Sequence, residues 1–149
     1  TFNVYLPVTE DVPMPHSAPE FKQIPRGHER ILFVDDENDL VDVGCQVLRG
    51  LGYQVTGCSE SPDALRFYLQ NPDSFDLVIT DMNMPSMSGA DLASAILKVR
   101  SDQSIILCTG YSDYIDREKA EELGIKEYIM KPLTRETLGL LVRKVLDQA

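Results

Sequence analysis

Side chains that can do chemistry follow four separate apolar runs of this sequence. They are three carboxylates, one hydroxyl and one ammonium: Asp35, Asp36, Asp81, Thr109 and Lys131. Each type alone has an ordinary structural role, since an Asp caps helices, a Thr satisfies nearby carbonyls and a Lys is solvated. Brought together, the three carboxylates would repel one another, which makes ionising all of them costly without a cation.

Mg²⁺ or Mn²⁺ would relieve that repulsion, because these hard cations prefer octahedral coordination by oxygen. Such an ion keeps open coordination positions for a phosphoryl group. Lys131 would then pair with a phosphate oxygen as a point charge, and Thr109 would donate a hydrogen bond to another. With Asp81 as nucleophile, the set predicts a phosphoryl-transfer site built from position and charge.

The elements that must position these side chains follow from the apolar periodicity. Strands are expected at residues 30–35, 53–58, 76–80, 104–108 and 127–130. Five helices are expected between and after them, at about 38–51, 62–70, 89–100, 113–123 and 134–147. This alternation predicts an α/β fold, a doubly wound parallel sheet with helices on both faces. In such sheets ligands bind beyond the carboxyl ends of the strands, where the three carboxylates, the hydroxyl and the ammonium are all expected.

Turn chemistry agrees with this division at five positions. Gly52 and Gly124 are placed to end helices. Ser61 is expected as an N-cap, followed by Pro62 at the first helical position. Gly89 is expected to supply a positive φ before the helix that follows Asp81.

Composition limits the classes of partner and the cellular compartment that the chain is expected to have. The chain has 149 residues, a formal charge of −10 and a pI near 4.5, which argues against binding to nucleic acid or to an anionic membrane. No apolar run is long enough to span a bilayer, and no signal peptide is visible. Three scattered cysteines without a CxxC motif fit small core residues in a reducing cytoplasm. The start at Thr1 suggests a piece of a longer protein.

The chain divides near residue 29. Five of the nine prolines fall before that point, so residues 7–29 have the composition of an extended, mobile linker. The opening run, residues 1–6, alternates Phe2, Val4 and Leu6 and is expected to form a strand. Residues 30–149 form the predicted α/β domain.

Four motifs, "VDDEND", "VITDMNMPSMSG", "ILCTGYSD" and "YIMKP", resemble those of response-regulator receiver domains, the CheY-like superfamily. The resemblance covers residues 30–149 and implies a flavodoxin-like fold with strand order 2-1-3-4-5. It implies Asp81 as phosphoacceptor and Asp35 and Asp36 as acidic metal-site residues. It implies that the backbone carbonyl of Asn83 is a ligand to Mg²⁺ and that Lys131 binds the phosphate. It also implies that Thr109 is the switch hydroxyl and Tyr128 the aromatic switch residue.

The resemblance also implies function and partners. A receiver catalyses its own aspartyl phosphorylation and dephosphorylation, taking the phosphoryl group from the phosphohistidine of a histidine kinase. A histidine phosphotransfer protein is a further expected partner. The family docks its donors at the first helix, where Val43 lies off the buried stripe and is expected to be part-exposed.

The opening run resembles the last strand of histidine-kinase ATP-binding domains, which favours the C-terminal receiver of a hybrid histidine kinase. The alternative is a stand-alone or N-terminal receiver with a separate output, and this chain shows no helix-turn-helix or basic segment of its own. A flavodoxin-type FMN site is disfavoured, because "DDEND" stands where its phosphate loop would be. A Mg²⁺-dependent aspartyl phosphatase of the haloacid-dehalogenase type would need a second acid where Asn83 stands. A further alternative is that the domain acts as a scaffold and is never phosphorylated.

Overall fold

The computed structural model describes residues 23–110, 123–125 and 127–149, and within them a five-stranded parallel sheet forms the centre of the domain. Its strands are β1 (Arg30–Val34), β2 (Gln54–Cys58), β3 (Leu77–Asp81), β4 (Ser104–Thr109) and β5 (Glu127–Met130). They lie in the order β2-β1-β3-β4-β5, which confirms the predicted flavodoxin-like topology. The strand ends differ from the predicted ones by a single residue at most.

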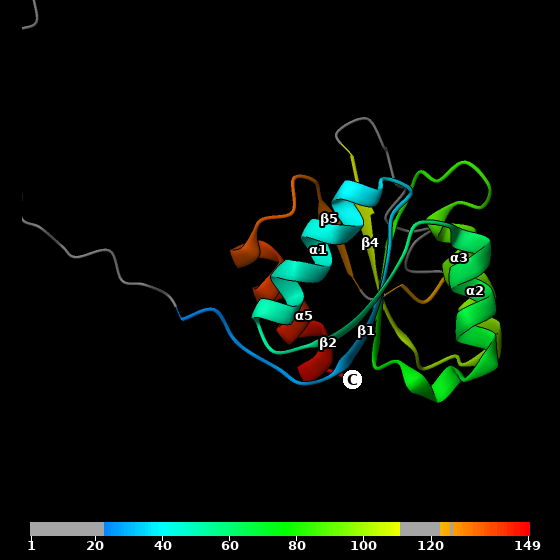
Figure 1. Cartoon of the computed structure of the whole chain (residues 1–149). Helices are drawn as coiled ribbons and strands as arrows, with labels where there is room; N and C mark the ends of the chain where they lie inside the picture. The colour runs from blue at the N-terminus through cyan, green and yellow to red at the C-terminus, as the bar shows by residue number, and fades with distance from the viewer. Residues whose placement is uncertain (1–22, 111–122, 126) are drawn as a thin grey trace, which may run out of the picture.

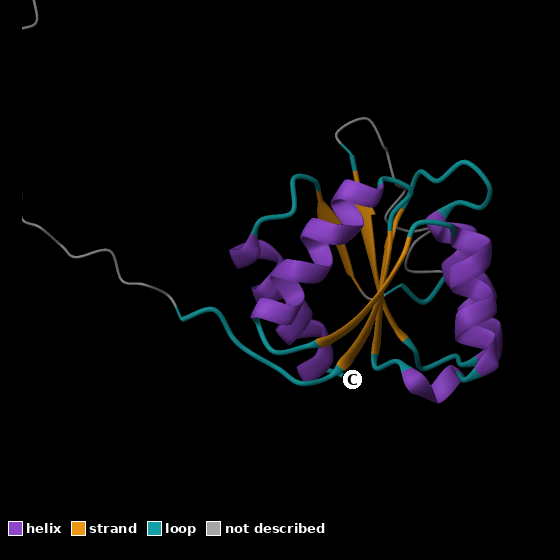
Figure 2. Ribbon diagram, in the orientation of Figure 1, coloured by secondary structure: helices purple, strands orange, loops and turns teal. Residues whose placement is uncertain are grey.

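Helices cover both faces of the sheet. The described helices are α1 (Asn38–Gly50), α2 (Ser61–Gln70), the short 3₁₀ helix η1 (Pro72–Ser74), α3 (Gly89–Val99) and α5 (Arg135–Asp147). Figures 1 and 2 show α1 and α5 on one face, and α2 and α3 on the other. The helix predicted at 113–123, the opening strand at 1–6 and the linker up to residue 22 lie outside the described residues.

The central strands are buried on both faces, as their unbroken apolar runs predicted. Ile31 and Phe33 pack into the cluster under α1 and α5, while Leu32 and Val34 pack into the cluster under α2 and α3. Each of these β1 side chains is at most 1% exposed. Because both faces are covered, only the strand ends can carry polar side chains that reach solvent.

Two of the predicted turn residues behave differently from expectation. Ser61 is the first residue of α2 and does not cap it, and its hydroxyl donates instead to the Met87 carbonyl at 2.8 Å. Gly89 does not have a positive φ; among the described glycines only Gly52 (102°) and Gly124 (76°) do. A Cβ on Gly89 would lie 2.1 Å from the Asp81 carbonyl oxygen, so a close backbone approach requires glycine there.

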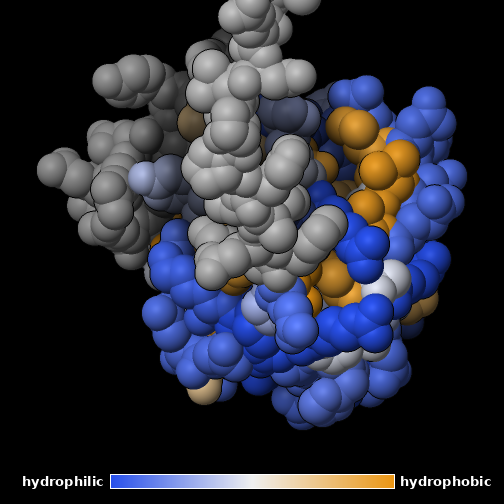
Figure 3. Space-filling model, turned by 90° about the vertical axis from the view of Figure 1, so that its left-hand side faces the viewer, coloured by the Kyte–Doolittle hydropathy of each residue, from blue (hydrophilic) through white to orange (hydrophobic). Residues whose placement is uncertain are grey.

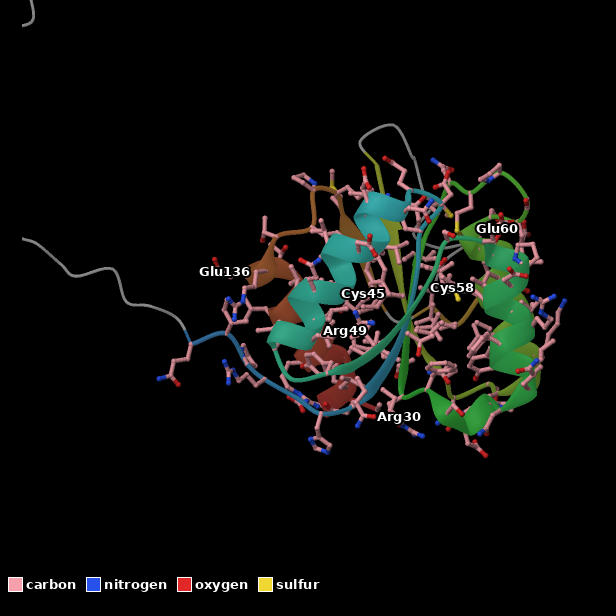
Figure 4. The ribbon with its side chains drawn as sticks, viewed as in Figure 1. Arg30, Cys45, Arg49, Cys58, Glu60 and Glu136 are labelled. Atoms are coloured by element: carbon pink, nitrogen blue, oxygen red, sulfur yellow. The ribbon has the colours of Figure 1, made fainter. Side chains whose placement is uncertain are left out.

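The three cysteines have free thiols and lie in the core or at its edge. Cys45 lies on the buried face of α1, and Cys58 lies on the other side of the sheet, toward α2 (Figure 4). Burial raises the pKa of both thiols, and it raises the pKa of Cys108 to about 12. These thiols are therefore packing residues rather than nucleophiles.

Within the part of the chain that the structure describes, no helix is both long and apolar enough to cross a membrane.

Candidate phosphoacceptor site

Two buried carboxylates lie side by side at the carboxyl edge of the sheet. Asp81 is the last residue of β3, and Asp35 follows β1, its hydrogen-bonded neighbour. The two residues are 6% and 1% exposed. Parallel pairing of Val34 with Thr80 carries both acids past the same edge, so the predicted convergence of Asp35 and Asp81 is found.

Lys131 bridges the two acids. Its Nζ lies 2.7 Å from Asp35 Oδ2 and 2.7 Å from Asp81 Oδ1. The lysine follows β5, and its backbone N–H donates to the Thr109 carbonyl at 2.8 Å, which fixes it beside the end of β4. Its peptide bond to Pro132 is cis. The ammonium therefore meets the carboxylates at the edge where the sequence placed it.

The second oxygen of each acid is held by the chain just beyond it. Asp35 Oδ1 accepts a hydrogen bond from the Glu37 backbone N–H at 3.1 Å. Asp81 Oδ2 accepts one from the Asn83 N–H at 2.9 Å. Each carboxylate is thus oriented by a local turn on one side and by Lys131 on the other.

The electrostatics show two acids sharing one cation. Burial raises the pKa of Asp81, and the nearby Asp35 adds to this, although Lys131 and the Asn83 N–H act in the opposite sense. Burial alone would lower the pKa of Lys131, but the hydrogen bonds and charges of both carboxylates raise it well above its ordinary value. Lys131 is therefore firmly charged. Its single positive charge, shared with Asp35, does not fully offset the effect of burial on the pKa of Asp81.

The other predicted site residues lie around this centre. Thr109 ends β4 and is 4% exposed. Tyr128 lies in β5 opposite Leu107, with 39% of its surface exposed. Asp36 is exposed and borders a cavity of about 200 Å³ beside Met84. Among the described residues, no three His, Cys, Asp or Glu side chains form a cluster that could hold a metal ion, so Asp36 is not drawn in beside Asp35 and Asp81.

Comparison with known proteins identifies this arrangement. The family model of the response regulator receiver domain matches residues 31–143. The chain belongs to the response-regulator receiver family. It is 34% identical over 127 residues to "Probable transcriptional regulator ycf27" of Cyanidium caldarium, covering 85% of this chain and 49% of that protein. The receiver thus spans about half the length of this curated relative.

Two solved structures share the receiver fold. A response regulator receiver domain protein from Clostridium thermocellum aligns with a TM-score of 0.76 and 32% identity, covering 80% of this chain and 95% of that one. The response regulator TrrA of Thermotoga maritima, solved in complex with Mg²⁺ and BeF, aligns with a TM-score of 0.71 and 32% identity. The alignment with TrrA covers 78% of this chain and 98% of that one.

The receiver's donor set fits a divalent cation. The buried Asp35 and Asp81 carry two negative charges against the single positive charge of Lys131, which leaves one to be balanced, and Asp36 is the exposed residue next to Asp35. All three offer hard oxygen donors, the kind that Mg²⁺ prefers. The buried Asp35 and Asp81 already point their oxygens at one cation, the ammonium of Lys131.

Residues that support the receiver's site were harder to find in the sequence. Met84 is 7% exposed and packs into the cluster under α2 and α3, so it is a core residue rather than a reactive one. Ser61, 20 residues before Asp81, ties α2 to the loop after β3 through the Met87 carbonyl. Met84 stands inside the loop motif, whereas the contact of Ser61 with Met87 joins residues 26 positions apart and has no local signal in the sequence.

An apolar groove opens beside the site, between α1 and the segment that follows β5. Its volume is about 420 Å³, and its lining includes Leu40, Val43, Val47, Lys131, Pro132 and Leu133. Figure 3 shows apolar surface on this side of the receiver, between hydrophilic borders. Val43 is 55% exposed, which confirms the prediction that it lies off the buried stripe of α1.

Proposed function

We propose that this receiver accepts a phosphoryl group from a phosphohistidine onto Asp81. The observation that carries the proposal is the Lys131 ammonium, 2.7 Å from an oxygen of each of two buried carboxylates. A charged cluster this well buried is costly to the fold, which favours a chemical role over a stabilising one. The short contact with Asp81 supports this proposal, because a phosphoryl group on Asp81 would bring its negative charge close to the ammonium.

Asp81 suits the role of nucleophile better than Asp35. Its side chain is 8% exposed, whereas that of Asp35 is 1% exposed, so Asp81 is the more accessible of the two to an incoming donor. A bond forms between one Asp81 carboxylate oxygen and phosphorus. The phosphorus–nitrogen bond to the donor imidazole breaks, and its electron pair stays on that nitrogen.

Mg²⁺ or Mn²⁺ would be held by Asp35, Asp36, Asp81 and the backbone carbonyl of Asn83. When bound, the cation neutralises charge on the phosphoryl oxygens. Lys131 then exchanges its contact with Asp81 for one with a phosphoryl oxygen and keeps its contact with Asp35. The Asn83 N–H continues to orient the Asp81 carboxylate during the transfer.

Thr109 and Tyr128 form the proposed conformational switch. The Thr109 hydroxyl, at the end of the strand next to β3, moves toward a phosphoryl oxygen on Asp81. The Tyr128 ring, now 39% exposed, turns inward into the space that this movement opens. Such a change requires the phosphorylated site to favour the second arrangement.

The donor is proposed to dock on the groove at Val43. A histidine donor must approach Asp81 from outside the sheet edge. Lys131, which contacts Asp81, also lines this groove, so the groove lies next to the site. A few apolar side chains can dominate such a contact. A histidine phosphotransfer protein would use the same surface.

Two settings for the receiver in its parent protein remain as proposals. A hybrid histidine kinase is supported by the kinase-like run at residues 1–6, which lies outside the described residues. A separate response regulator is supported by the relative named as a transcriptional regulator, of which the receiver covers about half. Sequencing the parent reading frame on both sides of this chain distinguishes them, since an upstream ATP-binding domain is expected only in the first.

The phosphoacceptor proposal is tested with acetyl phosphate as donor. The chain should gain one phosphoryl group by intact mass spectrometry in the presence of Mg²⁺, and none when EDTA is added. Asp81→Asn should abolish the gain, whereas the matched Asp63→Asn, at an exposed acid of α2, should not change it. Continued labelling of Asp81→Asn would overturn the assignment, and labelling in EDTA would overturn the metal requirement.

A further inference from the structure

The short segment just before β1 packs closely onto the receiver. Residues 24–29, called the strap below, precede the part of the chain that matches the receiver family, which begins at residue 31. Figure 1 shows this segment running past the ends of α1 and α5 before it enters the sheet. The strap lies at the amino-terminal edge of the sheet, because its end continues directly into β1.

Backbone hydrogen bonds fix the strap to two elements. The Gly27 N–H donates to the Leu51 carbonyl, just after α1, at 3.1 Å. The Gln54 N–H, at the start of β2, donates to the Glu29 carbonyl at 3.0 Å. These bonds hold the strap in register with β2 rather than leaving it as a free linker.

An ion pair joins the strap to α5. The Arg143 guanidinium lies 2.7 Å from Glu29 Oε1, and the two side chains are only 21% and 19% exposed. Arg143 also pairs with Asp147 one turn further along α5, but that carboxylate is 63% exposed. The Glu29 pair is thus the better shielded of the two.

Three glycines make room for the strap. A Cβ on Gly139 of α5 would lie 2.5 Å from Ile24 Cγ2, and one on Gly52 would lie 2.4 Å from the Gly27 carbonyl oxygen. A Cβ on Gly27 itself would lie 2.2 Å from the Tyr53 ring. Ile24 packs against the core cluster under α1 and α5. The fit involves three separate elements, which a passing linker would not need.

We propose that residues 24–29 are a built-in strap that clamps α5 to α1 and β2, with the surface around Leu51, Tyr53, Gly139 and Arg143 as its docking site. Ile24 begins the strap on the same side of the sheet as α1 and α5. Movement of the strap is thereby transmitted to α5 and α1, the helix that carries Val43. This inference does not depend on the chemistry at Asp81.

The test uses the full chain and two matched variants, each of which changes one of the two carboxylate partners of Arg143. Glu29→Gln weakens the contact with the strap, whereas Asp147→Asn weakens the contact within α5. Trypsin cleavage after Arg26 and hydrogen exchange of the Gly27 and Gln54 amides report release of the strap. We expect Glu29→Gln to speed both by about fivefold and Asp147→Asn to leave both unchanged.

A second variant removes the strap by steric conflict. Gly27→Val should drive the strap off the Tyr53 ring and expose the Gln54 amide, whereas His28→Val, on the exposed side of the strap, should not. Release in either variant should also speed exchange of the α5 amides around Arg143. Wild-type protein in which the Gly27 amide exchanges without protection would overturn the docking. Unchanged α5 exchange in a released variant would overturn the clamp.

Discussion

Each edge of the sheet has a group in which one cation lies between two acids, and the two groups differ in how deeply they are buried. At the carboxyl edge, Lys131 lies between Asp35 and Asp81, whose side chains are 1% and 8% exposed. At the other edge, Arg143 lies between Glu29 and Asp147, which are 19% and 63% exposed. The first group is closed off from water and the second is partly solvated.

That difference separates the proposed phosphoacceptor site from a structural contact. Solvent screens the excess charge around Arg143, so this group can hold two elements together at little cost. The carboxyl edge lacks such screening, because Asp35 and Asp81 are both buried. The proposed function has a further cation balance the excess negative charge there. The predictions below change one edge and use the other as its control.

Removing the cation at each edge should give the largest contrast. Lys131→Ala should slow acetyl phosphate labelling of Asp81 by about 10- to 100-fold, because the phosphoryl oxygens lose their ammonium partner. Mg²⁺ binding, followed by titration, should persist in this variant. Arg143→Ala should label at the wild-type rate. Loss of Mg²⁺ affinity with normal labelling in Lys131→Ala would show that the lysine serves the metal instead.

Charge placed in the groove should separate docking from chemistry. Val43→Glu should slow phosphotransfer from a cognate phosphohistidine protein by about tenfold, because a carboxylate would be buried against an apolar surface. Labelling by acetyl phosphate, which needs no docking surface, should not change. Equal slowing of both reactions would make Val43 a residue of the fold.

The switch should fail without loss of the phosphoryl group when its hydroxyl is removed. Thr109→Ala should still be labelled at Asp81, but the chemical-shift change at Tyr128 on phosphorylation should be reduced by about half or more. NMR of the Tyr128 ring measures this directly. A full-size change in the variant would mean that Thr109 does not couple the site to the ring.

The smallest predicted effect is a pH dependence at the strap. Burial opposes ionisation of Glu29, but its hydrogen bonds and the charge of Arg143 bring its pKa below the ordinary value of 4.5. The docked state thus binds fewer protons than the released one, so its contribution to stability is complete above 4.5 and is lost as the pH falls through the lowered pKa. The Gly27 amide shift should follow this loss, and Glu29→Gln should remove the dependence.

The sequence predicted the sheet well, because strands buried on both faces have unbroken apolar runs that leave little choice of register. The convergence of Asp35, Asp81 and Lys131 followed from the same topology, since parallel strands bring their carboxyl ends to one edge. The bridging position of Lys131 did not follow, because it depends on side-chain conformation at an ion pair that joins residues 96 positions apart.

Contacts without a local pattern could not be predicted. The Glu29–Arg143 pair joins residues 114 positions apart, and a proline-rich segment gives no periodicity from which to infer docking. Ser61 stood where an N-cap is expected, yet its hydroxyl had a better acceptor in the Met87 carbonyl. The positive φ expected at Gly89 is absent, because glycine is required there by a backbone oxygen eight residues away.

The central claim, that Asp81 rather than its acidic neighbours carries the phosphoryl group, has one direct measurement. Borohydride reduces an acyl phosphate to an alcohol in place, so labelled protein treated with it and digested should show one modified aspartate. The account predicts that peptide mapping finds this change at Asp81 alone, and only when Mg²⁺ was present during labelling. Modification at Asp35 or Asp36 would contradict it.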